Sequence, residues 1–116
     1  MNEDNRFPFQ RLDIYAVARE LAVRIHEARI TDAELRDQAT RAAKSAFLNL
    51  SEGLPHEQPG LRRRYFAAAN GSVHEVVGAV DLAVAIGAMD GEAAAAAQAL
   101  ALRLKRMLRA LTGRGR

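Results

Sequence analysis

The apolar residues of this chain recur at helical spacing in successive stretches separated by short breaks. In the first stretch, residues 10–29, the apolar positions step by four and three: Ile14, Ala18, Leu21, Ile25 and Ala28. Such steps place side chains on one face of an α-helix, so this stretch predicts an amphipathic helix. The second stretch, residues 32–54, carries two apolar rows at the same spacing and predicts a second helix.

Two further helices are predicted at residues 61–86 and 91–111. The loop PHEQPG at residues 55–60, with two prolines and a glycine, separates them from the first pair. Alternating runs of β-branched residues, which are typical of strands, are absent. Because short loops favour antiparallel neighbours, we predict a single all-α domain over residues 1–116. Its fold is an antiparallel up-down-up-down four-helix bundle.

Three short signals are expected to fix helix ends. Thr31 followed three residues later by Glu34 matches a capping box, which predicts that Thr31 caps the second helix. Gly87 is expected to end the third helix in a left-handed conformation. Asp90 is expected to cap the amino end of the fourth helix.

A polar stripe interrupts the second predicted helix. Arg41, Ser45, Asn49 and Glu52 follow one another at steps of four, four and three, so they share one side of the helix. In a functional interpretation, this stripe lines a cleft or a ring channel and contacts a ligand. In a structural interpretation, which we favour, it faces the third helix.

The structural interpretation predicts a polar network between the second and third helices. Arg41 would pair with Glu75, and the shorter polar groups would satisfy one another or the backbone. Such networks can set helix register and oligomeric state. The expected members of the network are Arg41, Ser45, Asn49, Glu52, Ser72 and Glu75.

The third predicted helix is apolar over most of its circumference, with Asn70, His74 and Asp81 on the face expected to be solvated. A helix of this kind is buried on more than one side. Glycine inside a helix costs about 1 kcal/mol relative to alanine. Gly71 and Gly78 are therefore expected to permit the close approach of another backbone, and we predict a homo-oligomer.

The net charge of +3 over 116 residues is unevenly distributed. Residues 61–116 carry nine Lys or Arg against four acids, whereas residues 1–60 carry eight against ten. A basic patch of this kind suits nucleic acid or an acidic protein partner, and it also suits a solvated face that binds nothing. The residues expected to make such a contact are Arg62, Arg63, Arg64, Arg103, Arg106 and Arg109.

Signs of catalysis or of a cofactor are missing from the sequence. The chain has no cysteine, and its three histidines fall on three different elements. Neither the metal-binding motif of di-iron bundles nor a phosphate-binding glycine loop occurs. We expect no enzymatic activity, no metal and no cofactor. A small-molecule site near His74 and Glu75 is kept as a third alternative.

The sequence also predicts the cellular setting. The longest apolar stretch, residues 65–89, contains His74, Glu75 and Asp81, so we expect no membrane span. The opening MNEDNRFPFQ lacks the apolar run of a secretory leader. We therefore expect a cytoplasmic protein.

Two motifs carry a resemblance to a known family. Residues 41–53 read RAAKSAFLNLSEG, and residues 66–75 read FAAANGSVHE. The chain resembles the bacterial four-helix-bundle family encoded in intervening sequences of large-subunit ribosomal RNA genes, whose second helix typically reads R-A-x-x-S-I-x-x-N-I-A-E-G. It departs from that motif at residues 46–47 and 50–51, where the changes preserve apolar or small character.

The resemblance implies an antiparallel four-helix bundle that assembles into a five-fold ring. It also implies a family whose biochemical role is mostly unassigned. A related branch resembles the accessory proteins of diversity-generating retroelements, which associate with a reverse transcriptase and with nucleic acid.

Together, the residues and the resemblance predict a non-enzymatic oligomeric binding or scaffold protein. Its expected partner is nucleic acid or a nucleic-acid-handling protein, contacted through a basic face. The alternative is a purely structural module that docks an acidic protein partner on the same face.

Overall fold

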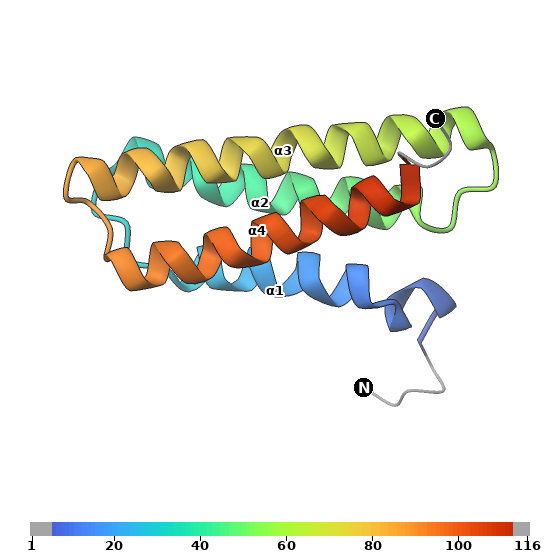
Figure 1. The fold of residues 1–116 in the computed structure, drawn as a ribbon, viewed down its shortest axis with the longest axis horizontal. Helices are drawn as coiled ribbons and strands as arrows, with labels where there is room; N and C mark the ends of the chain where they lie inside the picture. The colour runs from blue at the N-terminus through green and yellow to red at the C-terminus, as the bar shows by residue number, and fades with distance from the viewer. Residues whose placement is uncertain (1–5, 113–116) are drawn as a thin grey trace.

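The four periodic stretches each form an α-helix in the computed structural model, which describes residues 6–112 (Figure 1). The helices are α1 (Asp13–Glu27), α2 (Ala33–Gly53), α3 (Pro59–Ala85) and α4 (Gly91–Thr112). A 3-10 helix, η2 (Pro8–Arg11), precedes α1. No strand forms within residues 6–112 beyond one isolated bridge between Ile30 and Met89. The all-α prediction is confirmed.

The helices pack as an up-down-up-down bundle, because consecutive helices run in opposite directions (Figure 1). The most extensive contact joins α2 to α3. Smaller contacts join α1 to α2, α3 to α4 and α1 to α4, which closes the bundle. The predicted four-helix bundle is therefore confirmed.

The first helix begins three residues later than predicted, at Asp13 instead of residue 10. Pro8 starts the separate 3-10 turn, and Leu12 is extended between the two helices. Aromatic contacts hold this turn against the bundle. The Phe9 and Tyr15 ring centroids lie 5.6 Å apart, and those of Tyr15 and Phe47 lie 5.0 Å apart.

The predicted cap at Thr31 is wrong. The N-cap of α2 is Asp32, whose Oδ1 accepts a hydrogen bond of 2.9 Å from the Leu35 amide. Thr31 is held elsewhere, because its amide donates to the Ala88 carbonyl at 2.9 Å. Its hydroxyl donates to the same carbonyl at 3.4 Å. A tertiary contact between two loops therefore outweighs the local capping signal.

The predicted helix-end signals at Gly87 and Asp90 are confirmed. Gly87 adopts a left-handed conformation with φ of 78°. The Ala93 amide donates to Asp90 Oδ2 at 3.1 Å. The third helix begins two residues earlier than predicted, at Pro59, because Gln58 caps it with a hydrogen bond from the Leu61 amide.

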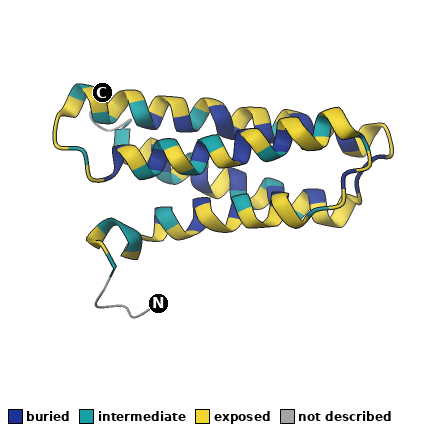
Figure 2. Ribbon diagram, turned by 180° about the vertical axis from the view of Figure 1, so that it is seen from behind, coloured by how far each residue is buried: buried dark blue, intermediate teal, exposed yellow. Residues whose placement is uncertain are grey.

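Alanine is the commonest residue of the core, which lies on the inner sides of the helices (Figure 2). Larger side chains such as Leu21, Leu50 and Leu104 fill the space between rows of buried alanine. At Gly53 the packing is tighter still. A Cβ atom there would lie 2.9 Å from both Phe66 Cε1 and Tyr65 Cβ. Small residues on α2 therefore let α3 approach closely.

Of the helices that the structure describes, none combines the length and apolar character needed to cross a bilayer.

Gly53 provides a test of this close packing. Replacing Gly53 by alanine forces its Cβ against a buried ring, and overpacking of this kind costs about 1–3 kcal/mol. That cost exceeds the roughly 0.5–1 kcal/mol that alanine gains over glycine within a helix. We expect Gly53→Ala to lower Tm in thermal unfolding followed by circular dichroism.

The matched control is Gly91→Ala, where a Cβ meets nothing within 4 Å. Its Tm is expected to stay level or to rise slightly. A Gly53 variant as stable as this control would show that α2 and α3 are farther apart than described.

Candidate anion-binding groove

The centre of the predicted polar network forms between α2 and α3. The Ser72 hydroxyl is buried and donates to Ser45 Oγ at 2.9 Å. Asn49 Nδ2 donates to Ser45 Oγ at 3.1 Å and to the Ser45 carbonyl at 2.9 Å. The three side chains thus satisfy one another at the most extensive helix contact of the bundle.

The outer members of the predicted network do not join it. Arg41, Glu52 and Glu75 are exposed, and within residues 6–112 no ion pair links Arg41 to Glu75. Arg41 instead lines a shallow hollow with His26 of α1. The predicted pairing is therefore wrong, because Ser72 is turned toward α2 whereas Glu75 faces solvent.

The basic residues at the start of α3 have separate positions. The Arg62 guanidinium carbon lies 5.1 Å from the centroid of the Phe66 ring, so Arg62 packs on the bundle as a cation–π partner. Arg63 and Arg64 are exposed. Successive residues of a helix point about 100° apart, so the three arginines cannot share one face.

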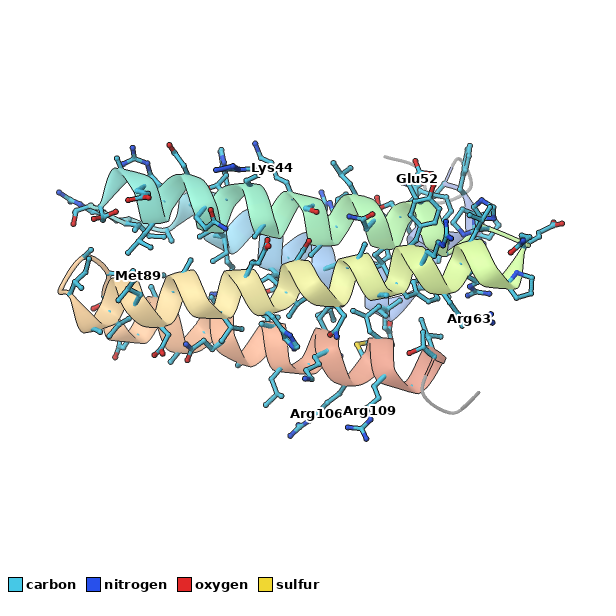
Figure 3. The ribbon with its side chains drawn as sticks, turned by 90° about the horizontal axis from the view of Figure 1, so that it is seen from above. Lys44, Glu52, Arg63, Met89, Arg106 and Arg109 are labelled. Carbon is cyan, nitrogen blue, oxygen red and sulfur yellow. The ribbon has the colours of Figure 1, made fainter. Side chains whose placement is uncertain are left out.

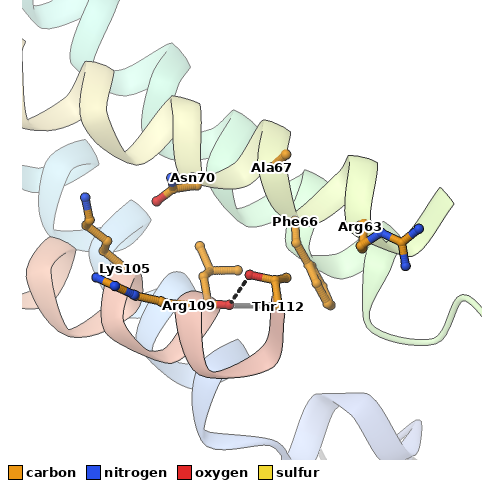
Figure 4. Close-up of a pocket in the computed structure, with 8 residues that line it drawn as sticks. Arg63, Phe66, Ala67, Asn70, Lys105, Arg109 and Thr112 are labelled. Carbon is orange, nitrogen blue, oxygen red and sulfur yellow. Dashed lines mark hydrogen bonds between the residues drawn. The ribbon is translucent and has the colours of Figure 1, made fainter. Parts of the chain in front are cut away.

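A groove between α3 and α4 is lined by cations from both helices (Figure 4). Arg63 of α3 and Lys105 and Arg109 of α4 line it, around a floor that contains Phe66 and Leu108. Its volume is about 440 Å³. None of its lining residues is acidic. Cations without a carboxylate neighbour favour an anion, and arginine suits phosphate because its donors form a planar fork.

The predicted row of arginines on α4 contributes only one residue to this groove. Arg103, Arg106 and Arg109 are all exposed, and Figure 3 shows Arg106 projecting away from α3, whereas Arg109 lies at the rim of the groove. Only Arg109 lines the groove.

Lys105 was missing from the predicted contact residues. A step of four from Lys105 to Arg109 places both side chains on one face, and this spacing was the available signal. The prediction instead followed the spacing of three residues that links Arg103 and Arg106 to Arg109.

Lys105 is also held by His74 of α3. Its Nζ donates to His74 Nε2 at 3.1 Å, because an ammonium group can only donate. His74 and Lys105 border a second hollow of about 640 Å³, which Glu75 does not line. The two side chains of the alternative small-molecule site therefore do not converge.

The predicted solvated face of α3 lies along these hollows. Asn70 lines the first, and His74 and Asp81 line the second. Within residues 6–112, no group of three or more His, Asp or Glu side chains is placed to hold a metal ion.

A comparison with protein families supports the resemblance drawn from the motifs. The family model described as 23S rRNA-intervening sequence protein matches residues 10–110. This range covers α1, α2 and α3 and all but the last two residues of α4. A search of curated proteins found no match.

The polar network can be tested by two double-mutant cycles. In the first, Ser45→Ala and Ser72→Ala are measured singly and together by urea unfolding. We expect a coupling of about 0.5–1.5 kcal/mol, the net contribution of a typical hydrogen bond. The cycle separates this coupling from the helix propensity of alanine, because each propensity effect occurs in both arms.

The matched cycle pairs Arg41→Ala with Glu75→Ala. Both side chains are exposed, so we expect no measurable coupling. A larger coupling in this second cycle than in the first would reinstate the original pairing and contradict the described geometry.

Proposed function

The chain belongs to the 23S rRNA-intervening sequence protein family, and from this premise we propose that it is a non-enzymatic, oligomeric protein that binds the phosphate backbone of nucleic acid. The observation that supports this proposal most directly is that Arg63, Lys105 and Arg109 line one groove. Two of these cations come from α4 and one from α3, so the groove depends on the folded bundle.

The charge of the groove suits a polyanion. Its three cations have no acidic neighbour among the lining residues, so their field is not cancelled locally. Arg64, Arg103 and Arg106 are also exposed on the same two helices, although they do not line the groove. Phosphate binding by such a surface releases counterions and weakens steeply with salt.

The aromatic residues support recognition of the backbone as the main source of affinity. Phe66 is buried, and Phe9, Tyr15 and Phe47 pack against one another at one end of the bundle. Tyr65 packs on His56, with ring centroids 5.7 Å apart. None of these five rings lines the groove as an exposed stacking platform of the kind used by single-strand binders.

An acidic protein partner is the second candidate. The groove floor includes the apolar side chains of Phe66 and Leu108, which an acidic peptide with an apolar anchor would also contact. A nucleic-acid-handling protein with an acidic segment on its surface would be a partner of this kind.

Self-association is part of the proposal. Gly71 and Gly78 lie in the middle of α3, and an added Cβ at either position meets nothing within 4 Å. Packing within the chain thus gives no reason for glycine at these positions. Leu82 and Ile86 extend the exposed face of α3, with 51% and 55% of their surfaces accessible. We propose that this face meets another copy, in the ring of five that the family resemblance implies, and that the protein is cytoplasmic.

The binding proposal predicts steep salt dependence. Replacing Arg63, Lys105 and Arg109 together by glutamate should weaken binding to short RNA and DNA by more than about tenfold, because phosphate contacts are lost. Each lost contact also lowers the steepness of log K against log salt by about 0.7–0.9. The slope of log K against log salt should fall by about 2. Fluorescence anisotropy at several salt concentrations measures both quantities.

The matched control replaces three exposed cations outside the groove, Arg19, Arg29 and Lys44, by glutamate. This variant has the same net charge but should keep most of the affinity. Equal losses in both variants would show that only net charge matters. Absence of binding by the unmodified protein at low salt would instead favour the acidic protein partner.

The assembly proposal predicts an oligomer in multi-angle light scattering. Replacing Gly71 and Gly78 by leucine should preserve helicity, because each position is open within the chain. The same change should dissociate the assembly, because it separates the approaching backbones. Leucine at the exposed α4 positions Ala95 and Ala99 is the control and should leave the mass unchanged. A monomeric parent protein would contradict the proposal.

A further inference from the structure

The basic groove continues into the second hollow along α3 and α4. Lys105 lines both hollows, so its side chain marks their junction. In Figure 4, Lys105 and Asn70 lie at one end of the basic groove and Arg63 lies at the other. The hydrogen bond from Lys105 Nζ to His74 Nε2, 3.1 Å long, holds the ammonium group at this junction.

The second hollow differs in chemistry from the first. Val77 of α3 and Leu102 of α4 supply its accessible apolar surface, because Val73 and Ala101, which also line it, are only 1% exposed. Leu102 is 47% exposed and lies on α4, whereas Gly78 of the proposed interface lies on the α3 side of the hollow. Gln98 and Asp81 supply polar groups at the same hollow. Backbone binding in the first hollow leaves this apolar surface unused.

The charges fix the orientation of a ligand that spans both hollows. Arg63, Lys105 and Arg109 attract an anionic group into the first hollow. The carboxylate of Asp81 in the second hollow repels an anion and accepts hydrogen bonds from neutral donors. A fitting ligand thus carries a phosphate at one end and a neutral, flat group with polar edges at the other.

We propose that the α3–α4 groove binds single-stranded nucleic acid, with its phosphates lying along Arg63, Arg109 and Lys105 and an unpaired base beside Lys105 seated on Val77 and Leu102. This inference rests on the proposed function and adds the strandedness of the ligand. In a duplex, the bases are stacked and paired, so a duplex offers phosphates to the first hollow and nothing to the second.

His74 acts here as a positioning residue. Its Nε2 accepts from Lys105 Nζ at 3.1 Å and keeps the ammonium group between the phosphate and the base. The basic groove is therefore not a diffuse charged surface, because its central cation has a defined place relative to the apolar hollow.

The experiment compares three ligands of equal length: a single strand, the same strand with abasic sites in place of its bases, and the duplex. Affinities are measured by fluorescence anisotropy at one low salt concentration. We expect the base-bearing strand to bind about fivefold to tenfold more tightly than the abasic strand, a difference close to 1.4 kcal/mol at the upper limit. When affinities are compared per phosphate contacted, the duplex should bind no more tightly than the abasic strand.

The test variant is Leu102→Asn, which removes apolar surface from the second hollow without changing charge. The ratio between base-bearing and abasic strands should fall close to one, while the affinity for the abasic strand stays the same. The matched control is Leu48→Asn on α2, a leucine 59% exposed and outside both hollows, which should leave the ratio intact. Light scattering and circular dichroism verify that both variants keep their fold and mass.

The outcomes separate the two proposals. Equal binding of base-bearing and abasic strands by the unmodified protein would overturn the seating of a base and leave backbone binding in place. Equal weakening of both strands by Leu102→Asn would also overturn it. Failure of every ligand to bind at low salt would overturn the proposed function itself.

Discussion

The close approach of α2 and α3 is the constraint on which the rest of the bundle depends. It requires glycine at residue 53, where the Phe66 ring occupies the place of a side chain. It also requires the short, mutually bonded side chains of Ser45 and Ser72, whose hydroxyl oxygens lie 2.9 Å apart. Larger residues at any of these points would separate the helices, and buried hydroxyls without partners would cost about 1–3 kcal/mol each.

This contact also explains where the bundle has room for a ligand. Because α3 is packed most extensively against α2, its contact with α4 is smaller, and two hollows remain along that side. Long side chains border them, since the α3–α4 seam does not exclude residues such as Arg63 and Lys105. The main stabilising contact and the proposed binding groove thus lie on different sides of α3.

The sequence was sufficient to predict the helices and their antiparallel order, because periodicity and loop length are local properties. It could not predict that Thr31 would bond to Ala88, since that contact joins loops 57 residues apart. The pairing of Arg41 with Glu75 failed for a related reason. Helical spacing shows which residues share a face, but the rotation of each helix about its axis depends on tertiary packing. Lys105 was missed because the partner that completes its site, Arg63, lies on a different helix.

The bond between Thr31 and Ala88, with the bridge between Ile30 and Met89, ties the α1–α2 loop to the α3–α4 loop at one end of the molecule. The basic groove lies toward the other end, where α4 finishes and α3 begins (Figure 1). The two loops are thus tied together at one end of the bundle, whereas at the other end α4 is held to its neighbours by side-chain packing. Amide exchange in α4 should accordingly be slower near the tied loops than toward Thr112, so that the width of the groove can change without disturbing the fold.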